Sequence, residues 1–162
     1  MSRWFFRPLR SSEARTILNW RYSPPYDFYN DTSSGPELDA AASDMAQASS
    51  GYFALHNAAG ELEGFCCVGQ EARVPGGDYS REALDIGVGM RPDLTGQRLG
   101  EAFMQAVLTF LIERYQPRRL RATVALFNER AQALCRSLGF AEVDRFARLS
   151  DGVLFCIFER DL

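Results

Sequence analysis

Apolar residues recur along this chain with two different periods, and the change of period marks the expected elements. Alternating or mostly apolar runs bounded by turn residues predict strands, whereas apolar residues three and four positions apart predict helices. The expected strands cover residues 4–9, 52–55, 62–70, 83–90, 120–126, 140–149 and 153–160. The expected helices run from a Ser11 or Ser12 cap to Arg21, around 38–45, from Gln97 through Phe110, and from an Asn128 cap to Gly139. Strands lie before, between and after these helices, which predicts an α+β domain.

Length and composition fit one globular domain spanning residues 1–162. A chain of 162 residues can bury a sizeable core, and no repeat or linker-like stretch divides it. Hydrophobic residues make up 46% and charged residues 24%, as in soluble globular proteins. The net charge of −3 gives no reason to expect nucleic acid, and no apolar run reaches membrane-spanning length. We therefore expect neither a nucleic-acid nor a membrane partner.

The cysteines and the N-terminal residues indicate a cytoplasmic protein. Cys66, Cys67, Cys135 and Cys156 show no metal-ligand spacing, and the first two lie inside an apolar predicted strand. We interpret all four as reduced thiols, and we expect no bound metal. The apolar stretch near the N-terminus is too short and too soon interrupted for a signal peptide.

The junction between the 83–90 strand and the following helix has the character of a phosphate-binding turn. The first amides of a helix lack partners within it and carry the positive end of its dipole, so they attract a diphosphate. Gly96 and Gly100 keep side chains out of that approach, and Arg98 adds a cation that can grip a phosphate or lie in solvent. We therefore predict that residues 95–100 cradle a pyrophosphate.

Two common nucleotide motifs do not fit this junction. A Walker loop ends in Gly-Lys-Ser/Thr, and that tripeptide does not occur in the sequence. A dinucleotide fingerprint needs a third glycine after Gly87-Val88-Gly89, but Pro92 stands there. A flavin or nicotinamide binder is therefore a distant alternative.

Thr95-Gly96-Gln97-Arg98-Leu99-Gly100 resembles motif A of the GNAT family of acyl-CoA N-acyltransferases, Arg/Gln-x-x-Gly-x-Gly/Ala after a strand. The chain departs from it at Thr95, where the family prefers Arg or Gln, and at Arg98, where it prefers Gly. A second segment, from Asn128 to Leu138-Gly139-Phe140, resembles motif B of the same family. The two segments together, at this spacing, identify the chain as a member of that family.

This resemblance implies a mixed, mostly antiparallel central sheet with helices on both faces and acetyl-CoA as co-substrate. The pantetheine arm would hydrogen-bond the exposed edge of the 83–90 strand, where Gly87 and Gly89 fit a close approach or a plain bulge. The expected cofactor-binding residues are Val88, Gly89, Met90, Thr95, Gly96, Gln97, Arg98, Leu99, Gly100 and Asn128.

The implied reaction is direct attack of an amine on the thioester in a ternary complex. Asp85, an acid within an apolar strand, is the candidate base; the alternative is a half-exposed residue paired with an arginine. Cys135 stands where many family members carry a tyrosine that protonates the leaving thiolate. Cys135 is a weak acid that protonates the thiolate, an inert packed thiol, or a residue without a role because water supplies the proton. An acyl-cysteine intermediate is the least favoured alternative.

The acceptor site is expected in an aromatic loop stiffened by two prolines and in the loop before the 83–90 strand. Its candidate residues are Trp20, Tyr22, Tyr26, Phe28, Tyr29 and Tyr79, with Glu71 and Arg73 nearby; a core role is the alternative for the aromatic loop. We interpret His56 as a surface or strand-end residue. Arg118, Arg119 and Arg121 are interpreted as a solvated loop, with contact to the 3′-phosphate of CoA as the alternative.

The sequence thus predicts an N-acetyltransferase acting on a small-molecule or peptide amine, as a monomer or homodimer. Alternatives are a larger acyl donor, an O-acceptor, and a non-catalytic acyl-CoA sensor. The identity of the acceptor stays open.

Overall fold

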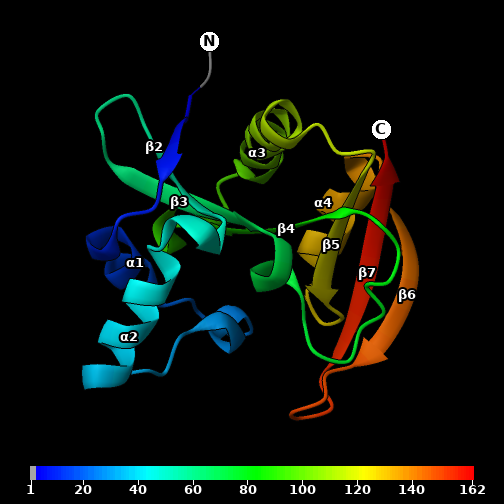
Figure 1. Ribbon diagram of the computed structural model, residues 1–162, viewed down its shortest axis with the longest axis horizontal. Helices are drawn as coiled ribbons and strands as arrows, with labels where there is room; N and C mark the ends of the chain where they lie inside the picture. The colour runs from blue at the N-terminus through cyan, green and yellow to red at the C-terminus, as the bar shows by residue number, and fades with distance from the viewer. Residues whose placement is uncertain (1–2) are drawn as a thin grey trace. The chain divides into compact units, whose positions relative to one another are not determined.

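The computed structural model describes residues 3–162, and Figure 1 shows their path. The strands are β1 (Phe5–Pro8), β2 (Tyr52–His56), β3 (Leu62–Val68), β4 (Leu84–Met90), β5 (Arg119–Ala125), β6 (Ala141–Ala147) and β7 (Leu154–Asp161). The α-helices of this described part are α1 (Ser11–Leu18), α2 (Gly35–Met45), α3 (Gly100–Tyr115) and α4 (Glu129–Ser137). Short 3-10 turns cover Tyr26–Tyr29, Ala48–Ser50, Gly69–Ala72 and Pro92–Leu94.

The strands form an open mixed sheet in the order β1-β2-β3-β4-β5-β7-β6. Antiparallel pairing joins β1 to β2, β2 to β3, β5 to β7 and β6 to β7. The parallel pair of β4 and β5 runs over Leu84–Ile86 of β4. The predicted mixed, mostly antiparallel α+β sheet is therefore confirmed.

The residues fall into two compact units. Unit 1 takes in residues up to 67 together with 88–106, and unit 2 takes in 68–87 together with 107–162. A single domain over 1–162 stays a prediction.

Unit 1 is built around the β1–β2–β3 ladder and the helix pair α1 and α2, which lie side by side in Figure 1. Its apolar cluster consists of the buried residues Leu9, Ala14, Ile17, Ala42 and Ala54. A surface ion pair between Arg15 and Asp39 also joins the two helices. These contacts explain why the short α1 is stable, since tertiary packing supplies most helical stability in proteins.

Two glycines in unit 1 leave room for aromatic rings. A Cβ at Gly89 would lie 2.1 Å from Cε1 of Phe65, and a Cβ at Gly64 would lie 2.5 Å from Cε2 of Phe103. Side chains at either position would therefore overlap the rings. The missing side chain of Gly89 is explained by ring packing, which neither the bulge nor the ligand interpretation had included.

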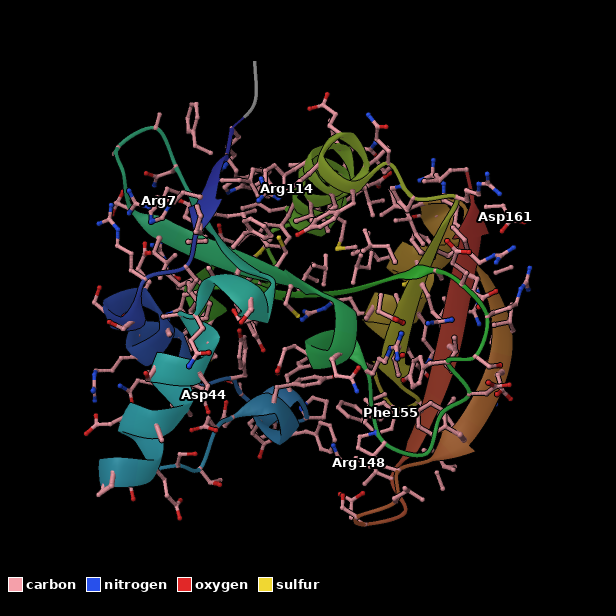
Figure 2. The ribbon with its side chains drawn as sticks, in the orientation of Figure 1. Arg7, Asp44, Arg114, Arg148, Phe155 and Asp161 are labelled. Carbon is pink, nitrogen blue, oxygen red and sulfur yellow. The ribbon has the colours of Figure 1, made fainter. Side chains whose placement is uncertain are left out.

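His56 is the last residue of β2, which agrees with the strand-end alternative, but it is buried and does not lie at the surface. It is only 6% exposed, and its Nε2 lies 2.5 Å from Oε2 of Glu13 and 3.0 Å from Nη2 of Arg7, a residue of β1 labelled in Figure 2. The backbone N–H of Arg10 donates to the other oxygen of Glu13. Burial raises the pKa of the Glu13 carboxyl, but these hydrogen bonds outweigh burial and leave that pKa lowered.

Unit 2 is built around the β5–β7–β6 ladder, whose buried residues include Leu120, Val124, Phe155, Ile157 and Phe158. The ring of Phe146 on β6 stacks on Phe155 with centroids 5.8 Å apart. The guanidinium of Arg148 lies over the Phe155 ring, 5.2 Å from its centroid. Figure 2 labels both residues.

Three expected boundaries need correction. The helix after the turn begins at Gly100, not Gln97, because Arg98 has a left-handed φ of 61° that no α-helix accepts. Helix α1 is capped at Arg10, not Ser11 or Ser12, because Glu13 accepts the Arg10 N–H, and it ends at Leu18. Arg119 and Arg121 belong to β5, not to a solvated loop.

Candidate functional site

The turn between β4 and α3 in unit 1 is braced by two of its own side chains. The hydroxyl of Thr95 donates to the Pro92 carbonyl at 2.7 Å, and the amide of Gln97 donates to the Asp93 carbonyl at 2.7 Å. These two residues therefore shape the turn with their side chains. What the turn can offer a ligand is mainly its backbone.

Two left-handed residues give the turn its path. Gly96 has φ 77° and Arg98 has φ 61°, and a Cβ at Gly96 would meet nothing within 4 Å. Position 98 thus has the backbone conformation that glycine adopts at no cost, which explains the family preference there. The Arg98 side chain is exposed.

Helix α3 starts directly after this turn and presents its first amides to it. The backbone N–H of Phe103 donates to the Leu99 carbonyl at 2.9 Å, the first bond of the helical ladder. The amides of Gly100, Glu101 and Ala102 therefore precede that ladder, as at any helix N-terminus. Over a helix of 16 residues, the dipole adds partial positive charge at this end. Glycine-lined open space beside such amides fits a diphosphate.

The edge of β4 that faces away from β3 can be assigned from strand alternation. The Gly89 carbonyl lies 2.8 Å from the site of a Cβ at Gly64, and the N–H of Arg91 donates to the Glu63 carbonyl at 2.8 Å, so residues 89 and 91 face β3. Backbone groups of neighbouring residues point to opposite edges, so those of Val88 and Met90 face the other way. The hydroxyl of Tyr22 donates to the Met90 carbonyl at 2.7 Å.

The aromatic loop is closed on itself in unit 1. The N–H of Tyr22 donates to Oδ1 of Asn30 at 2.7 Å, and Nδ2 of Asn30 donates back to the Tyr22 carbonyl at 3.4 Å. The rings of Phe28 and Tyr29 meet edge to face at 5.2 Å, and Tyr29 is 44% exposed. Trp20 is partly buried and packs against Phe65 beside the apolar cluster, so it takes part in the core.

In unit 2, Asp85 is held by two arginines. It is 2% exposed, and Arg121, with no exposed side-chain surface, donates to it through Nε at 2.6 Å and Nη2 at 2.8 Å. Arg73 Nε donates a third hydrogen bond at 2.8 Å. The anticipated arginine partner is present, but the side chain is buried and not half-exposed. The basic run 118–121 was misjudged because this partner lies 36 residues away.

Tyr79 lies against the same arginines. The Arg121 guanidinium is 4.9 Å from the ring centroid and the Arg73 guanidinium 5.3 Å, which suits cation–π contact. The Tyr79 hydroxyl accepts from the Val74 N–H at 2.9 Å and lies 2.9 Å from the Thr123 hydroxyl. Asp85 and Tyr79 are thus brought together through Arg73 and Arg121. Glu159 extends the cluster, with its Oε2 lying 3.8 Å from Nη1 of Arg121. Sequence reasoning named Arg121 only as part of a basic run, and it did not name Thr123 or Glu159.

Asn128 and Cys135 lie at the start and near the end of α4. Oδ1 of Asn128 accepts from the Ala131 N–H at 3.0 Å, which confirms the predicted cap. Cys135 is 6% exposed, and burial raises the pKa of its thiol to about 11. At neutral pH this thiol is protonated and packed.

The described residues include neither a metal-binding cluster nor a membrane-spanning helix. No group of three or more His, Cys, Asp or Glu side chains among residues 3–162 is placed to hold a metal ion. Over the same residues, no helix has the length and apolar character needed to cross a bilayer.

Comparison with known proteins adds a family and a fold. Residues 3–141 match the family model described as acetyltransferase (GNAT) domain. No curated protein sequence matches. A chimera of spermidine N-acetyltransferase SpeG from Vibrio cholerae and hSSAT is 16% identical, with TM-score 0.75 over 99% of this chain and 96% of that chain. A GNAT-family acetyltransferase from Bacillus anthracis is 11% identical, with TM-score 0.74 over 99% and 95%. At these identities the structures establish a shared fold.

Proposed function

Because this chain belongs to the GNAT family of acetyltransferases, we propose that it moves an acetyl group from acetyl-CoA to an amine by direct attack in a ternary complex. The observation that carries this proposal is the turn at 95–100. It combines two left-handed residues with the N-terminal amides of α3, in the segment that resembles the family's motif A. That backbone fits a pyrophosphate, and the exposed Arg98 can add a charge-assisted contact.

The donor would lie along residues of unit 1. The pyrophosphate would contact the amides near Gly96 and Gly100, and the pantetheine arm would hydrogen-bond the backbone of Val88 and Met90 on the edge away from β3. Acetyl-CoA supplies an activated acyl group, so the chain itself must orient the amine and manage two protons. The proposal that Asn128 contacts the donor rests on motif B alone, since its Oδ1 caps α4.

The contacts of Asp85 and the burial of Cys135 argue against these two side chains as the groups that carry the two protons. Asp85 accepts three guanidinium N–H groups, which leaves little of its lone-pair capacity for an ammonium. Cys135, with a pKa raised to about 11, is a poor proton donor at neutral pH. We therefore propose that water takes the amine proton and returns one to the leaving thiolate, with Asp85 and Cys135 in supporting roles.

The acceptor is proposed to be a small amine bound by the aromatic loop 22–30 of unit 1. Aromatic rings suit the apolar body and the cationic end of such a molecule. The neighbouring SpeG proteins are spermidine N-acetyltransferases, which makes spermidine the first amine to test. The four cysteines are free, which supports a reducing, cytoplasmic location.

A thermal-shift panel tests the donor. A ligand that binds only the folded chain at ~100 times its Kd adds about 2.7 kcal/mol of stability. We expect acetyl-CoA to raise Tm, and NADH, FAD and ATP to leave it unchanged. A rise with NADH and none with acetyl-CoA would contradict the donor assignment.

The second candidate function is a non-catalytic acyl-CoA sensor. It is favoured by the buried Cys135, which stands where many family members carry a tyrosine. A second assay separates this sensor from an enzyme. Free CoA release is followed with spermidine and then with other primary amines. We expect amine-dependent release. A clear thermal shift without release for any amine would favour the sensor.

A further inference from the structure

The carbonyl of Met90 accepts a hydrogen bond from a side chain of the same unit. It lies on the β4 edge that faces away from β3, where Val88 also presents its backbone groups. The Tyr22 hydroxyl holds this carbonyl at 2.7 Å, and burial raises the pKa of that hydroxyl to about 12, so it stays a donor at all ordinary pH values. One side chain thus occupies the end of the strand edge.

Tyr22 is also the first residue of the closed aromatic loop. Its backbone is tied to the side chain of Asn30 in both directions, so both ends of the loop move with Tyr22. Within the loop, the backbone N–H of Tyr26 donates to the Ser23 carbonyl at 2.9 Å, and the backbone N–H of Asn30 donates to the Asp27 carbonyl at 3.0 Å. The loop is therefore a small hydrogen-bonded unit with Tyr22 at its base.

We propose that Tyr22 is a positioning residue that transmits donor binding to the loop 22–30 through its bond to the Met90 carbonyl. The inference rests on the proposed function, because it takes the β4 edge as the donor site and the loop as part of the acceptor site. The N–H and the carbonyl of Met90 belong to neighbouring peptide planes that meet at the Met90 Cα. A donor bonded to the N–H of Met90 restricts the rotation of this residue and so steadies the carbonyl that Tyr22 binds. Binding thus favours the ordered loop by its differential affinity for that state.

Hydrogen–deuterium exchange with CoA as the probe tests this link without a known acceptor. In the unmodified chain, we expect CoA to slow exchange in 88–100 and in 22–30. Tyr22→Phe removes only the hydroxyl. In this variant, the slowing in 88–100 should persist, and the slowing in 22–30 should fall by about threefold to tenfold, the effect of one hydrogen bond.

Tyr115→Phe is the matched control, because it makes the same chemical change at the exposed end of α3. It should respond to CoA as the unmodified chain does. If Tyr22→Phe does not fold, as judged by its melting curve, Asn30→Ala replaces it. That variant keeps the Tyr22 hydroxyl but unties the loop, so the effect of CoA on residues 26–30 should be lost.

The outcomes separate this inference from the proposed function. Equal slowing of 22–30 in the unmodified chain and Tyr22→Phe, or no slowing of 22–30 in either, would overturn the link while the donor site stands. No slowing of 88–100 by CoA in any of these proteins would overturn the donor site itself.

Discussion

At the scale of single residues, Arg98 combines two opposite contributions. In the proposed function its guanidinium attracts a phosphate, but its backbone is left-handed with φ 61°, a conformation that costs a residue with a Cβ about 1 kcal/mol. The family's glycine avoids this cost and lacks the charge. Arginine in place of glycine at position 98 thus lowers the local stability of the turn but adds a positive charge there.

Replacing Arg98 tests both contributions. Arg98→Gly should raise the free energy of unfolding by about 1 kcal/mol, because glycine relieves the left-handed strain. Arg98→Ala should not, since alanine keeps the Cβ. Urea unfolding of both variants makes the comparison, and calorimetry with CoA should show the same loss of affinity in both. Identical urea midpoints would mean that position 98 carries no strain.

At the scale of elements, the first residues of β4 are joined to β5 by a buried ion pair. Asp85 lies opposite Arg121 in the parallel register, and both side chains are almost without exposed surface. An arginine buried in a strand needs such a partner, because an uncompensated internal charge is strongly destabilising. The pair therefore specifies which residues of β4 and β5 lie side by side.

Asp85→Asn should lower the free energy of unfolding by about 3 to 5 kcal/mol, because Arg121 and Arg73 then lose their charged partner. The matched control is Asp161→Asn, which breaks the ion pair with Arg119 at a carboxylate that is 73% exposed. That change should cost less than about 1 kcal/mol. Chemical denaturation measures both. Similar losses would contradict the buried-pair account, and a shifted pH–rate profile in Asp85→Asn would restore its role as base.

Much of the fold could be predicted because it follows local pattern. Alternation located β5 and β7, and the Asn128 cap and Gly139, with φ 88°, bounded α4. What could not be predicted depends on distant partners. His56 is buried by Glu13, which lies 43 residues away, and no periodicity shows such a pair. The late start of α3 was missed because arginine rarely adopts the left-handed backbone found at Arg98.

At the scale of the whole molecule, the side chains that can lose a proton between about pH 8 and pH 12 are those of cysteine and tyrosine. The 162 residues contain no lysine, since all 18 basic residues are arginines. Burial raises the pKa of the Cys66, Cys135 and Cys156 thiols above the ordinary value. The unfolded chain therefore loses these protons at lower pH than the folded chain does.

Stability should consequently fall as the pH rises from about 9 to about 11, the folded pKa of Cys135. Below that window both states keep the proton and the contribution is fully present. Each such thiol contributes a slope of up to about 1.4 kcal/mol per pH unit. Denaturation at pH 8, 9 and 10 should show a shallower fall for Cys135→Ala than for the unmodified chain. Parallel slopes would show that this thiol does not titrate differently in the two states.

The ring packing around Gly64 and Gly89 limits which amino-acid substitutions these positions can accept during evolution. Each glycine has an aromatic neighbour, Phe103 or Phe65, that fills the volume where its side chain would be. A larger residue at either glycine is accommodated only if its ring is exchanged for a smaller group. Homologous chains should therefore substitute Gly89 and Phe65 as a pair, so that these two positions covary. Gly64 should stay glycine even where Phe103 changes, because a Cβ there would also lie 2.8 Å from the Gly89 carbonyl.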